Sequence, residues 1–422
     1  GGPALFGRNN ASVLSAPTKT LLSSTGTVPT EVVIGDELVY RITVPGTAIA
    51  GTLFDVRVTD TLNPALEFVS ATMNPGPGAT AVPNSGTPSN VVLNLGPVNA
   101  QAVVDLRVRV ANNISANAGV LLDNTAAFTY ALTAGGVPIN GGTGSTPVGD
   151  QRRIVEPLVT LTKSVANLTN PLPSTRAGDV LRYTLTMTAA GGVVGDNFSH
   201  AYDVSLLDTL SLGLAYQGSP TVTGAGNTIA APVVVSGNGI SAPQVLSWSL
   251  AGGNANIDIN EGTTVTVTYD VVVLNTIVAN QVLSNSAIAR WTSLNGANAN
   301  ERTGSGTPIE NDYFTAPATT TITTPDTTTL TKTRLTDTYG AGDVNVRIGD
   351  IVDFELRLSL PPGTTAATSL SDVLPRGLRF EGTVSINGVA TAPYANVAPF
   401  THAAIAAPTV TGDPVTGPST VT

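Results

Sequence analysis

The sequence contains no cysteine and little charge. Because none of the 422 residues is a cysteine, disulfide bonds, thiolate catalysis and thiolate metal sites are excluded. Charged residues make up 11% of the chain and aromatic residues 5%. The long amphipathic helices rich in Glu, Lys and Leu that are common in enzymes are missing. The formal net charge is -10 and there is no basic stripe, which argues against a nucleic-acid partner.

Membrane, targeting and catalytic signatures are also missing. No apolar run of 18 residues marks a membrane span. There is no signal peptide, so we expect a mature form or an internal piece of a longer protein. No Gly-x-Ser-x-Gly motif, phosphate-binding loop or zinc spacing is present. We therefore expect no enzyme acting on an external substrate, no cofactor and no metal site. Weak Ca²⁺ binding by a loop such as Gly195-Asp196-Asn197 stays an open alternative.

What the chain does contain is glycine, proline and short β-branched runs. There are 43 glycines and 29 prolines, and 41% of the residues are hydrophobic. Short β-branched runs broken by Gly, Pro and Asn predict an all-β chain with real cores, and the length suits two or three domains. A long, acidic, Thr- and Gly-rich β-chain without cysteine is typical of an exported bacterial surface protein. Such a protein needs a means other than disulfides to staple its domains.

Lysine is almost as rare as cysteine. Only Lys19, Lys163 and Lys332 occur among 19 basic residues, and all the others are arginine. These three positions therefore select a primary amine. An arginine guanidinium stays protonated, whereas a buried lysine can lose its proton and become a nucleophile.

One pattern is repeated around these lysines. After each lysine comes a Gly-Asp turn and a strand with an apolar residue at every second position, which predicts a half-buried strand. A later strand carries an aspartate in phase with its apolar residues, so period-2 geometry points this carboxylate toward the core. In the first two units a closing strand also carries an asparagine on its apolar face. The core-facing polar residues are Asp60, Asp208 and Asp372, and then Asn124 and Asn285.

The repeats predict tandem Ig-like β-sandwiches with loop-rich insertions, over residues 1–155, 156–325 and 326–422. The Gly-, Pro- and Thr-rich stretches 143–147 and 316–329 are expected to be extended connectors between units. The middle of each unit is expected to be loop, at about 72–98, 217–247 and 382–420. The third unit lacks the strand with the asparagine. We expect it to be completed by further chain beyond residue 422 or by a partner chain.

The three polar residues of each full unit predict a covalent cross-link. In an apolar site, desolvation lowers the pKa of lysine and raises that of aspartate. A neutral amine can then attack the asparagine side-chain carbonyl, while the protonated aspartate donates to the oxygen and shuttles the proton as ammonia leaves. The product is a Lys–Asn isopeptide bond. The alternative is an ordinary Lys–Asp ion pair beside a turn-capping asparagine. The candidate sets are Lys19, Asp60 and Asn124; Lys163, Asp208 and Asn285; and Lys332 with Asp372, which has no asparagine partner in the chain.

The order of these motifs resembles the bacterial DUF11 conserved repeat domain of isopeptide-forming fimbrial and surface proteins. The motifs are the lysine, Gly-Asp-x-Leu-x-Tyr, Asp-Thr-Leu or Asp-Val-Leu-Pro-Arg-Gly-Leu, and Asn-Thr/Ser-Ala. The resemblance covers nearly all of the chain, as two full copies and one partial copy. It implies Ig-like sandwiches strung along a secreted cell-surface protein. The first copy departs from the pattern, because Asn63-Pro64-Ala65-Leu66 replaces the usual Pro-x-Gly-Leu turn.

Together these features predict a structural segment of a bacterial cell-surface or extracellular filament protein. Its partners would be further copies of itself or neighbouring subunits in a surface assembly. Two alternatives stay open. One is an adhesin whose inserted loops bind a carbohydrate or protein, and the other is a surface-layer lattice protein.

Overall fold

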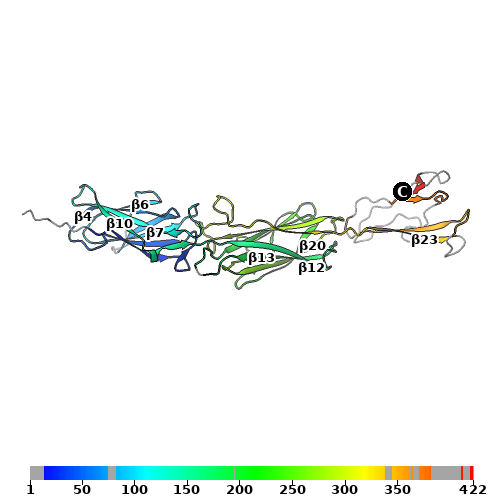
Figure 1. Cartoon of the computed structure of the whole chain (residues 1–422), viewed down its shortest axis with the longest axis horizontal. Coiled ribbons are helices and arrows are strands. Elements are labelled where there is room, and N and C mark those ends of the chain that lie inside the picture. The colour runs from blue at the N-terminus through cyan, green and yellow to red at the C-terminus, as the bar shows by residue number, and fades with distance from the viewer. Residues whose placement is uncertain are drawn as a thin grey trace, which may run out of the picture.

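The computed structural model describes residues 14–74, 82–193, 195–337, 345–360, 363–364, 370–381, 410–411 and 419–421. Regular structure in these residues is β-strand, apart from one 3-10 turn at Val148–Asp150, and they contain no α-helix. The all-β prediction is confirmed, and the chain forms Ig-like β-sandwiches that follow one another along its long axis (Figure 1). None of the described residues form a helix that could cross a membrane.

Two four-stranded sheets and a small third sheet build the first sandwich. In β3 every second residue is fully buried, because one face of this strand packs on the core. The first sheet has the order β1 (Thr18–Ser24), β3 (Glu37–Val44), β7 (Ala102–Val110), β5 (Leu66–Met73). The second has the order β10 (Ile139–Ser145), β9 (Thr125–Ala131), β4 (Leu53–Thr61), β6 (Asn90–Val98). The small sheet joins β2 (Glu31–Val32), β11 (Arg152–Ile154) and β8 (Leu121–Leu122).

The second sandwich repeats this strand order. One sheet runs β12 (Val159–Asn167), β13 (Val180–Ala189), β20 (Thr264–Val273), β15 (Leu214–Val222). The other runs β17 (Val233–Ser236), β18 (Gln244–Trp248), β14 (Tyr202–Leu210), β21 (Val282–Thr292), β22 (Ala318–Thr323). A hairpin joins β16 (Thr228–Ile229) to β19 (Ala255–Asn256). The first strand carries its lysine at the same register in both copies, with Lys19 opposite Ile42 and Lys163 opposite Leu185.

The described part of the third unit consists of short sheets. β23 (Thr329–Asp337) pairs with β24 (Val352–Ser359), and β25 (Asp372–Leu374) pairs with β27 (Ser419–Val421), which also pairs with β26 (Val410–Thr411). Leu330 is 50% exposed and Phe354 is 39% exposed, so the described strands do not enclose a core here. Most of the insertion predicted at 382–420 lies outside the described residues.

The insertions predicted at 72–98 and 217–247 are not simply loops, and that prediction is wrong in part. β6 pairs with β4, and β18 pairs with β14, so both segments contribute a strand to a core sheet. In β6 the buried residues Val91, Val92 and Leu93 form a continuous run without alternation. A short continuous run next to Gly96 and Pro97 lacks the period-2 signal of a half-buried strand. Residues 75–81 of the first insertion lie outside the described residues.

The stretches predicted as connectors belong to the sandwiches, which corrects a second expectation. Residues 143–145 lie in β10, which pairs with β9, and residues 318–323 form β22, which pairs with β21. β9, which directly follows Asn124, and β21, which carries Asn285, are therefore not the last strands of their units. Gly144 has a packing role, because a Cβ there would lie 1.9 Å from the carbonyl oxygen of Pro17. Thr and Gly in an edge strand carry little apolar alternation and look like linker sequence.

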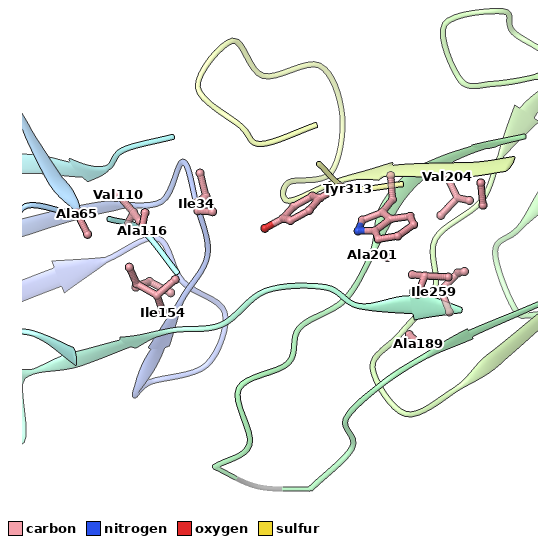
Figure 2. Packing of buried hydrophobic residues seen from close by; sticks show 14 of the residues in the cluster. Ile34, Ala65, Val110, Ala116, Ile154, Ala189, Ala201, Val204, Ile259 and Tyr313 are labelled. Atoms are coloured by element: carbon pink, nitrogen blue, oxygen red, sulfur yellow. The ribbon is translucent and has the colours of Figure 1, made fainter. Parts of the chain in front are cut away.

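A polar junction joins the two sandwiches. Arg302, 4% exposed, donates to Oε1 of Glu156 at 2.6 Å, to Oδ1 of Asn112 at 3.0 Å and to the carbonyl of Asn113 at 2.9 Å. Tyr313 points from the second sandwich toward the first (Figure 2) and donates to the same Glu156 oxygen at 2.9 Å. Gly35 is required by both its φ of +97° and its neighbours, since a Cβ would lie 2.7 Å from the Leu294 side chain. The second sandwich is therefore fitted against the first.

Candidate functional site

In the second sandwich the lysine, aspartate and asparagine meet across the core. Lys163 lies on β12 of one sheet, while Asp208 on β14 and Asn285 on β21 belong to the other sheet. Lys163 Nζ donates to Asp208 Oδ2 at 2.5 Å and to Asn285 Oδ1 at 2.7 Å. The side chains of Lys163 and Asp208 are 0% exposed, and Asn285 is also 0% exposed. The amine therefore contacts both the acid and the amide in a dry site.

Strand register explains why these side chains converge. Asp208 pairs with Ala287, and Asn285 lies two residues before Ala287 on the same face of β21. The first sandwich has the same offset, because Asp60 pairs with Ala126 and Asn124 lies two residues before it. The two sites are thus equivalent positions in equivalent strand pairs.

Tyr269 of β20 completes the site in the second sandwich, and it is not among the residues predicted from the sequence to form the site. Its hydroxyl donates to Asp208 Oδ2 at 2.5 Å and accepts from Asn285 Nδ2 at 2.8 Å. Lys163 Nζ also lies 3.2 Å from this hydroxyl. The available signal was a tyrosine in the buried phase of β20, whose other buried positions in that phase are valines. A phenol buried in such a row needs a hydrogen-bond partner.

In the first sandwich the same elements place Lys19, Asp60 and Asn124 in the core. Lys19 Nζ donates to Asp60 Oδ2, and both side chains are 0% exposed. Asn124, between β8 and β9, is 1% exposed. Among the described residues, both polar side-chain atoms of Asn124 and Oδ1 of Asp60 have no hydrogen-bond partner. This site therefore has its ion pair in place, while its asparagine lacks the hydrogen bonds that Asn285 makes.

Burial acts in opposite directions on the two charged groups. Desolvation lowers the pKa of both Lys19 and Lys163 to about 8, although the neighbouring aspartate opposes this shift. Burial raises the pKa of Asp60 and Asp208, and the lysine opposes that shift. The proton is therefore shared between amine and carboxylate far more evenly than it would be in water. The arrangement supplies a nucleophile, an acid and, in Asn285, a carbonyl within reach of the amine.

The third pair lies in a more open setting. Lys332 Nζ donates to both carboxylate oxygens of Asp372, at 2.6 and 2.8 Å. The lysine side chain is 34% exposed and that of the aspartate 17% exposed. Within the described part of the third unit, the pair has no asparagine partner. The sequence predicts that Asp372 points into a core. Its side chain is only partly buried, because the described strands do not cover it.

The other candidate sites are a metal site and the loop considered for Ca²⁺ binding. Among the described residues, no group of three or more His, Cys, Asp or Glu is placed to hold a metal ion. In the loop considered for Ca²⁺, Asp196 accepts the backbone N–H groups of Val193 at 3.1 Å and Phe198 at 2.9 Å. Its carboxylate therefore serves to close the turn.

Comparison with known proteins finds solved structures at low identity and low TM-score. No protein-family model matches the sequence, and no curated protein matches it, so membership of the DUF11 family stays a prediction. The C-terminal domain of the AgI/II polypeptide BspA of Streptococcus agalactiae is 13% identical, covering 72% of this chain and 99% of that one, with a TM-score of 0.35. The T6 backbone pilin of Streptococcus pyogenes is 13% identical, covering 77% of this chain and 68% of that one, with a TM-score of 0.26. The major pilin SpaD of Corynebacterium diphtheriae is 16% identical, covering 64% of this chain and 59% of that one, with a TM-score of 0.26. At these identities and TM-scores, none of these proteins defines what this chain does.

Proposed function

We propose that this chain is a structural segment of a bacterial cell-surface or extracellular filament protein, whose β-sandwiches are stapled by Lys–Asn isopeptide bonds. The observation that carries the proposal is the 2.7 Å contact between Lys163 Nζ and Asn285 Oδ1, in a buried site that also holds Asp208. The absence of cysteine supports a different kind of staple. The domains would be residues 1–155, 156–325 and 326–422, with copies of itself or neighbouring subunits as partners. It would act on no external substrate.

The bond-forming step needs only the groups already in place. The neutral amine of Lys163 attacks Cγ of Asn285, the Cγ–Nδ2 bond breaks, and Nδ2 leaves as ammonia. The proton that Nζ loses is the proton that ammonia gains, and Asp208 carries it between them. The same scheme applies to Lys19, Asp60 and Asn124.

The bond would strengthen each sandwich by closing a long loop across its two sheets. Lys163 and Asn285 are 122 residues apart in the sequence. By the chain-entropy model used for disulfides, closing such a loop is worth roughly 4–5 kcal/mol. Tension applied to the chain ends would then pass through the bond and bypass most of the core strands.

Intact mass under denaturing conditions tests the proposal. Each bond formed from asparagine releases one ammonia, about 17 Da, so the purified chain should be lighter than its sequence by two ammonias. Asp60→Ala and Asp208→Ala should each restore one of them, whereas Asp105→Ala, which alters a surface pair with Arg41, should restore none. A mass equal to that of the plain sequence would leave Lys19 and Lys163 as ordinary buried ion-pair partners.

One observation favours a second function, that of a glycan-binding adhesin. A groove of about 520 Å³ on the first sandwich is lined by Asp55, Arg57, Asn94, Thr129 and Tyr130, among others. This volume suits a small ligand. Among the described residues the Arg57 guanidinium has no hydrogen-bond or ion-pair partner. An arginine beside a tyrosine ring suits a sugar that carries a carboxylate.

The second sandwich fills the corresponding place with its own chain. In the second sandwich Ser205 of β14 pairs with Arg290 of β21. This is the position at which Arg57 of β4 pairs with Thr129 of β9 in the first sandwich. Arg290 donates to the carbonyl of Gly304, and the hollow that remains is about 190 Å³. A glycan array with acidic glycans tests the open groove. Binding by the intact chain should be lost in Arg57→Ala and kept in Arg107→Ala, and no binding to any glycan would reject this function.

A further inference from the structure

The two buried sites differ at one residue that faces the asparagine. In the second sandwich Tyr183 of β13 pairs with Tyr269 of β20. In the first sandwich the corresponding Tyr40 of β3 pairs with Leu106 of β7. Leu106 has no polar atom in its side chain, so only the second site holds a hydroxyl at this position.

The Tyr269 hydroxyl bridges the acid and the nitrogen that would leave. It donates to Asp208 Oδ2 at 2.5 Å, and it accepts from Asn285 Nδ2 at 2.8 Å. Nδ2 is the atom that departs as ammonia when the isopeptide bond forms, and it must gain one proton to do so. In the first sandwich, Asn124 Nδ2 has no hydrogen-bond partner among the described residues.

We propose that Tyr269 is a catalytic residue of cross-linking in the second sandwich, where it relays a proton from Asp208 to the departing Nδ2 of Asn285. This inference rests on the proposed isopeptide function. Lys163 Nζ forms its bond to Cγ and gives one proton to Asp208. Once Asp208 carries this proton, both hydrogen bonds of the tyrosine hydroxyl reverse, and the carboxyl group passes a proton to the tyrosine oxygen as the tyrosine passes its own proton to Nδ2. Tyrosine ends the step unchanged, the Cγ–Nδ2 bond breaks, and no further reactant is needed.

The surroundings of Tyr269 suit a neutral relay. Burial raises the pKa of this phenol well above its usual value, and the nearby Asp208 raises it further. The hydroxyl therefore keeps its proton unless another reaches it, as a relay requires. The neighbouring Tyr183 is stacked on Tyr269 with ring centroids 5.7 Å apart. Its own hydroxyl makes no hydrogen bond to Asp208, so it cannot take the proton from that acid and provides a matched control.

The inference predicts that the two bonds form at different rates in one chain. In the first sandwich Asp60 has to deliver the proton to Asn124 without a hydroxyl between them. Since a positioned proton donor typically contributes a factor of about 10²–10⁴ to a rate, the bond at Asn285 should form at least tenfold faster than the bond at Asn124.

The test follows both bonds during synthesis of the full chain. The chain is made in a cell-free system, samples are stopped in denaturant at intervals, and the two cross-linked peptides are quantified after proteolysis. Tyr269→Phe should slow the bond at Asn285 at least tenfold while the bond at Asn124 forms at its wild-type rate. Tyr183→Phe should change neither rate. Tyr269→Leu introduces the residue that the first sandwich carries at this position, and it should slow the same bond to a similar extent.

Two results would overturn the inference, and they can be told apart. Equal rates at Asn285 in the wild type, Tyr269→Phe and Tyr183→Phe would remove the relay and leave the cross-link intact. If the wild-type chain gave no cross-linked peptide from either sandwich, the proposed isopeptide function itself would fail. The bond at Asn124 reports in every variant that the first sandwich has folded, and hydrogen exchange in β13 and β20 reports the same for the second sandwich.

Discussion

Lys163 Nζ and Asn285 Oδ1 lie 2.7 Å apart although the two residues are 122 positions apart in the sequence. One belongs to the sheet of β12 and the other to the sheet of β21. Their contact therefore crosses the core from sheet to sheet, where it is shielded from water. The side chains of Lys163 and Asp208 are fully buried, so this polar contact affects stability whether or not it becomes covalent.

Removing the lysine should damage the second sandwich much more than the third unit. Lys163→Met leaves the buried carboxylate of Asp208 without its cation, and breaking such a pair costs about 3–5 kcal/mol. Lys332→Met breaks a partly exposed pair, for which we expect about 0–1 kcal/mol. Urea unfolding of the full chain, monitored by hydrogen exchange in each unit, measures both effects. A similar loss of unfolding free energy in the two variants would contradict the expectation that the buried pair matters more than the exposed one.

In a chain without the two asparagines, the free energy of unfolding should depend on pH in the way that free buried lysines require. In Asn124→Ala with Asn285→Ala, no bond can form, and both lysines keep folded-state pKa values of about 8, below the ordinary value of about 10.4 in the unfolded chain. Between these values the unfolded chain binds more protons than the folded chain. The free energy of unfolding should therefore rise from pH 8 to pH 10, by on the order of 1 kcal/mol per pH unit for each lysine.

The wild type is the control for this pH effect, because a lysine nitrogen in an amide bond does not titrate. Urea unfolding at pH 7.5, 8.5 and 9.5 compares the two chains. The rise should be present in the double variant and missing from the wild type. If both chains responded alike, the lysines of the wild type would be free amines.

The junction between the sandwiches should depend on Arg302. Arg302→Met removes the hydrogen bonds to Asn112 and Asn113 of the first sandwich. It also leaves the Glu156 carboxylate, which accepts the Ala118 N–H of that sandwich, without its cation. The loss should weaken the junction by about 3 kcal/mol. Small-angle scattering should then show a broader distribution of end-to-end distances, with faster hydrogen exchange at Asn112 and Asn113. Arg107→Met, which alters an exposed pair with Glu37, should leave the scattering unchanged. An unchanged curve for Arg302→Met would mean that other contacts hold the junction.

Gly35 provides an independent test of the same junction. Gly35→Ala places a Cβ 2.7 Å from the Leu294 side chain, on a residue whose φ is +97°. We expect a loss of about 1–3 kcal/mol from backbone strain alone. Gly178→Ala is the matched control, because Gly178 has a φ of +88° but no neighbour within 4 Å of the added Cβ. The midpoint temperature of thermal unfolding should fall in both variants, whereas the scattering curve should change only in Gly35→Ala.

The sequence predicts the parts of the fold where apolar alternation is strong. β3, β4, β7 and their counterparts alternate cleanly, and the inward-facing Asp60 and Asp208 follow from that period. β6 is missed because it is buried as a continuous run, and β10 and β22 are missed because edge strands rich in Thr and Gly have no apolar face. The buried phase of β20 indicates only that the Tyr269 hydroxyl needs a partner. Which partner it has is not predictable from the sequence, because this depends on pairing with β13 and on the placement of Asn285 across the core.

The position of β22 after Asn285 affects how the chain would stretch. A bond from Lys163 to Asn285 leaves everything after Asn285 outside the closed loop, including β22 and the junction segment, residues 293–317, which contains Arg302 and Tyr313. Under rising load, β22 would peel from β21 before the core could open, and the junction segment would follow. Residues 293–325 would be released, roughly 33 residues, an added length of about 115 Å at full extension. Each stapled sandwich would thus carry a built-in length reserve that dissipates a sudden pull and can fold back when the load ends.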